Sequence, residues 1–282
     1  MSSDAELDLD DLALAAANGD RDALERLCKA LQHPMYRLAL RMLGYRPDAE
    51  DATQEILVRI VTNLGSFEGR SKFTTWAYTV AVRQLLRTRK RAVESSVASA
   101  ERFGQVIDEG IASSDFSAES EAEANLLCGE VRIACSYGML LALSRETRVA
   151  YILADMLGFT DKEGASICGT TPAAFRQRVS RGRKTMRTII EDRCGLVDER
   201  NRCRCSRQVE SSINLGVLDR DGLLYATHPG VEGPIETGTL RAAADELDIV
   251  EKIAAVYRSA PEFLAPETVW DRLREAAPTL LR

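Results

Sequence analysis

Residues 160–187 read TDKEGASICGTTPAAFRQRVSRGRKTMR, and this stretch decides how the second half of the chain folds. Thr160 is followed three positions later by Glu163, a capping-box pattern that predicts a short helix beginning after Thr160. After the turn GTT, Thr171 and Pro172 predict the start of a second helix, because proline is well tolerated at the first helical position. The pattern is therefore helix, three-residue turn, helix.

The second of these helices has the chemistry of a DNA-reading surface. In a helix-turn-helix the second helix enters the major groove of duplex DNA. Phe175 and Val179 lie four positions apart and are expected to face inward. Outward-facing arginines suit guanine edges and phosphates, and glutamine suits adenine. We predict DNA contacts from Thr171, Arg176, Gln177, Ser180, Arg181, Arg183 and Lys184. The alternative is a basic surface helix without DNA contact.

The first half of the chain is also helical by its periodicity. Apolar residues recur at helical spacing between residues 22 and 64, and Pro34 and the break at residues 44–47 are predicted to separate the helices. The third helix is DAEDATQEILVRIVTNL, residues 48–64, with apolar residues four apart on one face. Its polar face contains Asp51, Gln54 and Glu55. From periodicity alone this is an ordinary amphipathic helix.

Residues 67–91, FEGRSKFTTWAYTVAVRQLLRTRKR, combine aromatic and cationic side chains. Flat rings can stack on unpaired bases while cations hold the phosphate backbone, as in proteins that bind single-stranded DNA. Phe73 and Ala77 have the spacing of a core face, and a core position is also favoured for Trp76. We predict contacts with melted DNA from Phe67, Arg70, Ser71, Lys72, Arg83 and Arg87.

The net charge of −6 is unevenly distributed over the 282 residues. Two basic blocks, residues 20–91 and 140–209, each have a net charge of +6. They alternate with acidic blocks of −5, −7 and −6 at residues 1–19, 92–139 and 210–282. Because a local positive field attracts phosphate, the overall negative charge does not exclude a DNA partner. The alternative is that these blocks are only solvated surface.

The order of these motifs resembles that of an extracytoplasmic-function (ECF) sigma factor, the promoter-reading subunit of bacterial RNA polymerase. The resemblance covers roughly residues 20–190 and implies an all-α fold of two helical domains joined by a flexible linker, followed by a small α or α+β extension. We expect an acidic segment at 1–19, a region 2-like bundle at 20–91, an acidic flexible linker at 92–138, a region 4-like helix-turn-helix domain at 139–192, a Cys/Arg-rich segment at 193–209 and a C-terminal extension at 210–282.

The resemblance also implies partners. In the family the acidic helix docks on the clamp helices of the largest polymerase subunit, the aromatic loop and basic helix read the minus-ten element, and the recognition helix binds the minus-thirty-five element. A pocket that holds a flipped base can favour strand opening without ATP. The resemblance therefore implies binding to core RNA polymerase by Asp51, Gln54, Glu55 and Arg59. Here Phe-Arg-Gln-Arg at residues 175–178 replaces the centre of the family's recognition pattern, so the resemblance does not predict which bases this helix prefers.

Two alternatives compete with this interpretation. One is a helix-turn-helix regulator that binds duplex DNA independently of polymerase. The other is a zinc enzyme built on the cysteines near residue 200. No nucleophile constellation, P-loop or dinucleotide fingerprint is present, which favours a non-enzymatic protein with no catalytic residues and no required cofactor.

Seven cysteines are unevenly spread along the chain. Cys194, Cys203 and Cys205 fall within twelve positions and could hold Zn²⁺ together with His228, although the spacing is not that of a standard zinc finger. Neighbouring arginines could instead lower the thiol pKa values and create a redox switch, or these thiols could be unremarkable. Core positions are expected for Cys28, Cys128, Cys135 and Cys168.

The acidic extension contains a helical stripe at residues 240–257 and a shorter helix through Trp270 and Leu273, and residues 214–238 suggest a hairpin. By charge complementarity, the extension could cover the basic DNA-binding faces and restrain the protein in cis. It could equally be a partner-binding module, and a separate anti-sigma factor is the other means of restraint. With no apolar span of about 20 residues and no secretory signal, we expect a cytoplasmic protein without a membrane partner.

Overall fold

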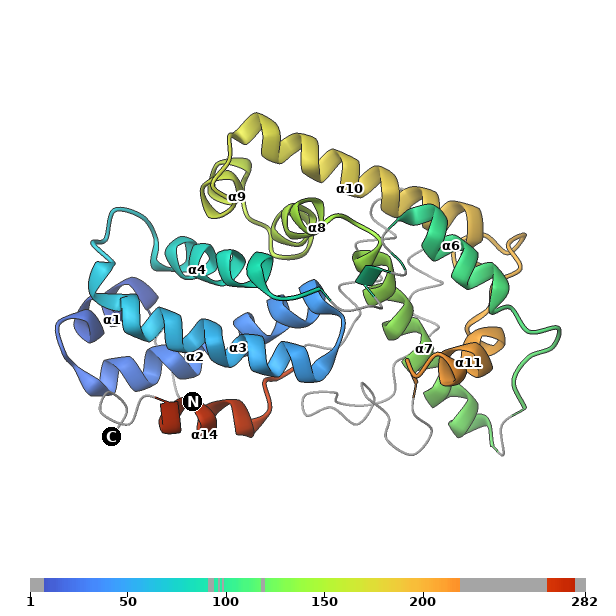
Figure 1. The fold of residues 1–282 in the computed structure, drawn as a ribbon, viewed down its shortest axis with the longest axis horizontal. Helices are drawn as coiled ribbons and strands as arrows, with labels where there is room; N and C mark the ends of the chain where they lie inside the picture. Colours follow the sequence, from blue (N-terminus) through green and yellow to red (C-terminus); the bar gives the residue numbers. More distant parts are fainter. Residues whose placement is uncertain are drawn as a thin grey trace, which may run out of the picture.

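The computed structural model describes residues 8–90, 94–95, 97, 99–117, 120–218 and 263–276. In these ranges every regular element is a helix, which confirms the all-α prediction. The elements form two helical groups that pack against each other (Figure 1). None of the helices in the described part is both long and apolar enough to cross a membrane. The predicted stripe at residues 240–257 and most of the predicted hairpin lie outside the described residues.

The first group is a four-helix bundle made by the N-terminal part of the chain. Buried apolar faces of these helices join one core, and a short 3₁₀ turn at Leu64–Ser66 leads into the loop before the last helix. The helices are α1 (Leu9–Ala17), α2 (Arg21–Leu43), α3 (Arg46–Asn63) and α4 (Phe73–Arg87).

Helix α2 runs without interruption through Pro34, so the prediction that this proline separates two helices is wrong. Proline removes one intrahelical hydrogen bond and disfavours a helix interior. Here Leu31, Met35 and Leu38 around it are almost completely buried, and this packing outweighs the local cost. The predicted break after α2 is present, since Gly44 adopts a left-handed φ of 67° and α3 begins at Arg46.

The stretch predicted as a flexible linker contains helix α6 (Ala100–Glu109) and most of α7 (Glu121–Leu141). Its Ser- and Glu-rich composition suggests a connector, but Phe103 and Ile107 lie four apart and are buried. Ser99 and Ser120 cap the two helices through their hydroxyl groups. A linker region is present between the two groups, as expected, but two capped helices occupy much of it, so the expectation of a flexible segment is wrong for these residues.

The second group contains the predicted helix-turn-helix. The helix-turn-helix part is formed by α8 (Arg145–Tyr151), a π-helical turn (Ile152–Met156), α9 (Asp161–Ile167) and α10 (Pro172–Arg193). Helices α6 and α7 pack on it and belong to the same group. Both halves of the Thr160–Glu163 capping box are present, and Thr171 caps α10. Gly164 of α9 lies where a Cβ atom would collide with the ring of Phe175, so glycine permits the close approach of the two helices.

Two further helices follow the recognition helix. Helix α11 (Cys205–Asn214) packs on α7. Helix α14 (Glu267–Ala276) confirms the short helix predicted through Trp270 and Leu273. It lies against α2 and α3, on the side of the bundle away from α10 (Figure 1). The described part of the extension does not cover the recognition helix, but residues 219–262 lie outside the described ranges, so the charge-based hypothesis stays a prediction.

A buried ionic cluster joins the two helical groups. Glu94, just after the first bundle, accepts hydrogen bonds from the Nε and Nη2 atoms of Arg145 at 2.9 and 2.7 Å. Arg148 lies 3.0 Å from the same carboxylate and is only 1% exposed. Burial opposes ionisation of Glu94, but the hydrogen bond from Arg145 and the charges of Arg148 and Arg145 offset it, so its pKa is lowered.

The two guanidinium groups also donate to backbone carbonyl groups from several helices. Arg145 donates to the carbonyl oxygens of Leu85 and Thr88 at the end of α4. Arg148 donates to Met42 at the end of α2. It also donates to Leu140, Leu141 and Leu143. One cluster thus satisfies helix-terminal carbonyls of both groups.

We predict that Glu94→Gln lowers the free energy of unfolding by about 3 kcal/mol, because two buried arginines would lose their counter-charge. Urea unfolding followed by circular dichroism measures the change. Glu109→Gln, which neutralises an exposed carboxylate on α6, is the matched control and is expected to change stability by less than about 0.5 kcal/mol. Equal losses in both variants would contradict the prediction.

The same cluster predicts a pH dependence. Because the folded-state pKa of Glu94 is lowered, its stabilising effect is complete above the ordinary glutamate pKa of about 4.3 and is lost as the pH falls through the lowered value. The difference in stability between the unmodified chain and Glu94→Gln should therefore shrink below about pH 4. A constant difference down to pH 2 would show that the carboxylate charge is not responsible.

Candidate nucleic-acid and partner interfaces

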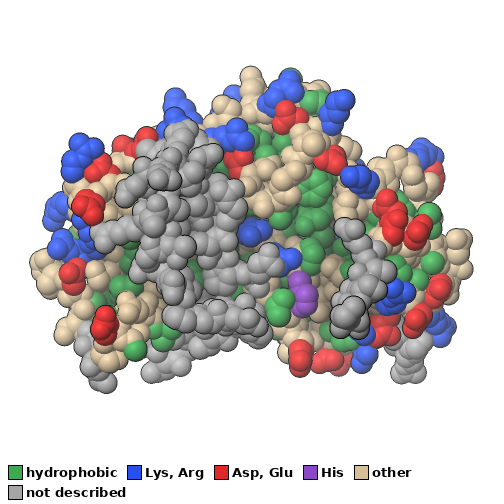
Figure 2. All heavy atoms as spheres, turned by 180° about the vertical axis from the view of Figure 1, so that it is seen from behind, with side chains coloured by type: hydrophobic (Ala, Val, Ile, Leu, Met, Phe, Trp, Pro, Cys, Tyr) green, Lys and Arg blue, Asp and Glu red, His purple; other side chains and the backbone are tan. Residues whose placement is uncertain are grey.

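The recognition surface of α10 is arranged as the sequence predicts. Phe175 and Val179 are buried in the core. Figure 2 shows Lys and Arg side chains along the edge of the molecule where Figure 1 places α10. The predicted DNA-contacting residues are all solvent-exposed, namely Thr171, Arg176, Gln177, Ser180, Arg181, Arg183 and Lys184. One exposed helical face therefore carries hydroxyl, amide and cationic groups.

Two arginines of this face are oriented by carboxylates of neighbouring elements. Arg183 binds Asp155 of the π-helical turn through two nitrogens, at 3.0 and 2.6 Å. The hydrogen bond to Asp155 raises the pKa of Arg183 above its already high ordinary value, so the guanidinium stays protonated. Arg176 lies 3.4 Å from Asp161 at the start of α9. Within the described residues, Arg181 forms no such ion pair, which leaves its guanidinium available for a phosphate or a base edge.

The aromatic loop before α4 differs from the prediction at Phe67. Phe67 is only 6% exposed, and its ring lies 5.2 Å from that of Phe73 and 5.8 Å from that of Trp76. Phe73 and Trp76 also stack on each other at 5.6 Å, so the core positions expected for them are confirmed. Because the Phe67 ring is enclosed in this cluster, it is not available to stack on a base in this conformation, and its DNA contact stays a prediction.

The other predicted contacts of this segment remain on the surface: Arg70, Ser71, Lys72, Arg83 and Arg87. Arg70 forms an ion pair with Glu68. The loop ends where the backbone N–H of Phe73 donates to the carboxylate of Asp10 on α1. Asp10 thus satisfies an orphan donor at the start of α4, a role that sequence reasoning missed in the acidic N-terminal segment.

Helix α4 and the helix-turn-helix lie against each other. The ring of Tyr78 on α4 meets that of Phe159, just before α9, edge to face at 4.9 Å. Helix α4 also packs on α9 itself (Figure 1). The two predicted DNA-binding segments are therefore adjacent in this conformation.

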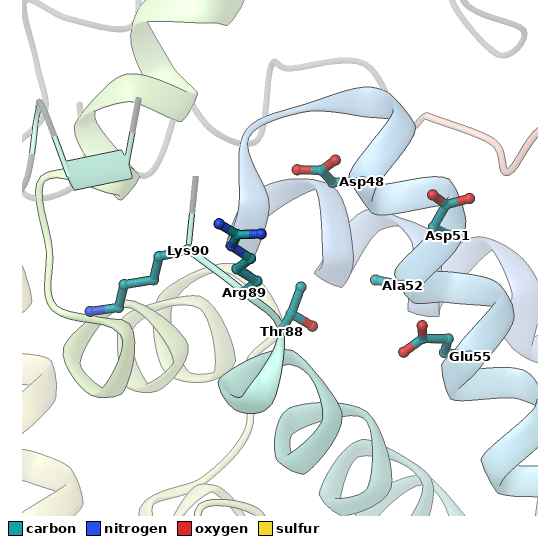
Figure 3. Close-up of a pocket in the computed structure, with 7 residues that line it drawn as sticks. All are labelled: Asp48, Asp51, Ala52, Glu55, Thr88, Arg89 and Lys90. Carbon is teal, nitrogen blue, oxygen red and sulfur yellow. The ribbon is translucent and has the colours of Figure 1, made fainter. Parts of the chain in front are cut away.

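The polar face of α3 is a second candidate interface. Asp51, Glu55 and Arg59 are exposed and Gln54 is half-buried, as expected for residues that meet a partner. A surface pocket of about 420 Å³ lies beside this face. Figure 3 shows the carboxylates of α3 on one side of it and residues that follow α4 on the other. The pocket is lined by Asp48, Asp51, Ala52, Glu55, Thr88, Arg89 and Lys90.

Three of the four predicted partner-binding residues already have side-chain contacts within the chain. Asp51 forms an ion pair with Arg272 of α14, at 3.0 Å between Oδ1 and Nη1. The side-chain amide of Gln54 donates to the backbone carbonyl of Arg272 at 3.5 Å. Glu55 accepts a hydrogen bond from the side chain of Gln84 on α4. The α14 contacts were not predictable from the periodicity of either helix.

The cysteines after α10 come together with one from α7. Cys194 and Cys203 pair in an isolated backbone bridge, and Cys205 begins α11. Burial raises the pKa of Cys135 well above its usual range, and the neighbouring charges of these three cysteines raise it further. Cys135, expected only as a core residue, therefore belongs to the same thiol cluster. Among the other cysteines expected in the core, Cys28 is 1% exposed.

This cluster gives limited support to the metal and redox hypotheses. Within the described ranges, no group of three or more His, Cys, Asp or Glu residues is arranged to hold a metal ion, and His228 lies outside those ranges. Burial raises the pKa of Cys203 to about 11 and that of Cys205 to about 12. A reactive redox thiol has a lowered pKa, so the raised pKa values of Cys203 and Cys205 do not favour the redox switch. Zinc binding by Cys194, Cys203, Cys205 and His228 stays a prediction, which metal analysis of the purified protein would test.

Comparisons with known proteins agree with this architecture. Residues 27–94 match the family Sigma-70 region 2, and residues 136–186 match Sigma-70, region 4. The chain is 25% identical over 182 residues to the ECF RNA polymerase sigma factor SigW of Bacillus subtilis, an alignment that covers 62% of this chain and 92% of SigW. It is 28% identical over 185 residues to the ECF RNA polymerase sigma factor SigC of Mycobacterium tuberculosis, covering 62% and 87%.

A solved structure of CnrH in complex with the cytosolic domain of CnrY matches 64% of this chain and 96% of its own chain, at 19% identity and a TM-score of 0.45. The two family matches therefore lie in one chain, with region 2 before region 4. The curated relatives are ECF sigma factors, and the chain is similar to them over about 62% of its length, while the residues after 186 lie outside both family matches. This family consists of transcription initiation factors.

We predict that Cys203 and Cys205 react slowly with iodoacetamide in the folded protein. At pH 8 a thiol with a pKa near 11 is about 0.1% ionised, roughly 100-fold less than an ordinary cysteine. Peptide mass spectrometry after timed alkylation gives the rate at each cysteine, and the same protein unfolded in urea is the control. Rapid labelling of Cys203 in the folded protein would instead favour the redox-switch hypothesis.

Proposed function

We propose that this chain binds core RNA polymerase, recognises two promoter elements and promotes strand opening during transcription initiation. The observation that supports this most strongly is the presence, in one chain, of an acidic partner-type face on α3 and an exposed recognition surface on α10. These faces lie in the segments that match Sigma-70 regions 2 and 4. It would act where polymerase is found, in the bacterial cytoplasm.

For polymerase binding we propose Asp51, Gln54, Glu55 and Arg59. All are at least partly accessible on one side of α3. The neighbouring pocket places three carboxylates, those of Asp48, Asp51 and Glu55, beside this surface. A partner segment with cationic side chains would complement these charges.

For DNA binding we propose that the two helical groups contact different forms of the DNA, one the duplex and the other the melted strand. Exposed side chains of α10 would read the duplex in the major groove, with Arg183 held in position by Asp155. The surface cations of the loop and of α4 would hold the melted strand through its phosphates. Since Phe67 is enclosed, a base platform in this region would require the aromatic cluster to open. We propose that the chain itself catalyses no covalent step and requires no cofactor for this activity.

Run-off transcription with purified core polymerase on a genomic fragment library tests the proposal directly. We expect new, defined start sites only when the protein is present, and these would yield both promoter elements. Binding to duplex DNA without binding to core polymerase would favour the independent helix-turn-helix regulator instead. Binding to core polymerase without new transcripts would indicate that the C-terminal extension restrains the activity of the bound protein.

We predict separable effects of two substitutions on α10. Arg181→Ala should weaken binding to all promoter sequences and reduce the salt dependence of log K by about 1, as expected for the loss of one phosphate contact. Gln177→Ala should instead relax base preference at one position, by about 1–3 kcal/mol. Fluorescence anisotropy with promoter variants at several salt concentrations distinguishes the two.

The matched control is Arg102→Ala, which removes an exposed cation from α6 outside the recognition surface. It should leave both the affinity and the salt slope unchanged. An equal loss in the Arg102 variant would show that only net charge matters, which would contradict a specific role for Arg181.

A further inference from the structure

Helix α14 sits on the first bundle through buried apolar residues. Val269 is 1% exposed and Leu273 is fully buried, and both belong to the same core as α2 and α3. The ring of Trp270 lies between two cations, with Lys29 Nζ of α2 at 5.6 Å and Arg274 Cζ at 5.3 Å from its centroid. Such contacts are typical of a docked helix.

The segment before α14 strengthens the docking. The backbone N–H of Ala265 donates to Nδ1 of His33 on α2 at 2.9 Å. Phe263 is 2% exposed, and its ring lies 6.5 Å from that of Tyr137 on α7. The residues that precede α14 are therefore held in place by contacts with α2 and α7.

The polar contacts of α14 fall on the acidic face of α3. Arg272 holds the carboxylate of Asp51, and the backbone carbonyl of Arg272 accepts from Gln54. Arg274 lies 3.8 Å from Glu25 of α2. Helix α14 thus presents two cations to the bundle although the extension as a whole has a net charge of −6. In this docking, an amphipathic helix places two arginines against acidic side chains of α2 and α3.

We propose that α14 competes in cis with core RNA polymerase for the α3 face that contains Asp51 and Gln54. This inference rests on the proposed function, in which the same two residues bind polymerase. Helix α14 packs on α3 and contacts Asp51 and Gln54, so a second helix docked on these residues would overlap with it, and α14 must leave before the full polymerase contact forms. The partner that displaces it is expected to offer similar chemistry, a helical segment with a cation opposite Asp51.

The proposal has a quantitative consequence for affinity. If only the undocked form is competent, the apparent Kd for core polymerase equals the intrinsic Kd divided by the undocked fraction. Buried Leu273, Val269 and Phe263 favour the docked form. Weakening α14 docking should therefore tighten polymerase binding, whereas most substitutions at a true partner interface weaken it.

The test is to measure core polymerase binding by full-length variants changed only on α14. Leu273→Asp places a charge in the docked interface, and we expect it to bind core at least about 10-fold more tightly than the unmodified chain. Trp270→Ala removes a half-buried ring and should tighten binding by a smaller factor without the risk of burying a charge. Glu275→Ala, on the exposed side of the same helix, is the control and should leave the Kd unchanged.

Hydrogen exchange gives an independent readout that does not depend on transcription. In the free protein the amides of α14 should be protected, and they should lose protection when core polymerase binds while the amides of α3 retain it. Unchanged protection of α14 in the polymerase complex would overturn the proposal, as would equal core affinity for the unmodified chain and both docking variants.

Failure of the underlying function has a different signature. If no form of the protein binds core polymerase, including Leu273→Asp and Trp270→Ala with native circular dichroism, then the proposed function itself fails. If all forms bind equally and transcribe, the sigma activity stands and only the competition by α14 is refuted.

Discussion

The buried cluster of Glu94, Arg145 and Arg148 is the constraint on which the arrangement of the two helical groups depends. Its carboxylate follows the first bundle and its guanidinium groups come from α8. These groups also satisfy carbonyl oxygens at the ends of α2 and α4. A buried ion cluster contributes little to net stability compared with apolar packing, but it is costly to separate one member from the others. It therefore specifies one relative position of the groups more than it strengthens the fold.

If the chain binds two promoter elements at once, as proposed, it must use a different position on the promoter. The minus-ten and minus-thirty-five elements are about 25 base pairs apart, which corresponds to about 85 Å along B-form DNA. In this structure α4 packs directly on α9, with Tyr78 and Phe159 in ring contact. A chain that binds both elements at once must separate the two groups and expose Glu94, Arg145 and Arg148 to water or to new partners. Under the proposed function, the closed arrangement would therefore belong to the protein away from promoter DNA.

Local signals explain which features could be predicted from the sequence. The helix-turn-helix follows from caps, a turn and a proline within about thirty residues, and each acts on its own neighbours. Phe67 could not be assigned in this way, because an aromatic ring beside cations can either pack in a core or stack on a base. Only its contacts with Phe73 and Trp76 show that the ring is buried in this structure. Glu94 and Arg145 are 51 positions apart, and nothing in the spacing of a lone glutamate indicates its partner. The docking of α14 on α3 was not predicted for a related reason. The net charge of the whole extension is negative, and this sum does not reveal that Arg272 and Arg274 form ion pairs with acidic residues of the bundle.

The α14 contacts and the buried ion cluster are linked through α7. Phe263 meets Tyr137 of α7, while the following helix covers α3, so the C-terminal segment touches both helical groups. Displacement of α14 by a partner on α3 would remove this bridge and leave the ion cluster and the α4–α9 contacts to hold the groups together. By reciprocity of linked equilibria, anything that separates the groups would also weaken α14 docking and favour the partner on α3. Polymerase binding and domain opening would then reinforce each other, and promoter DNA, which requires the open form, would select the same state.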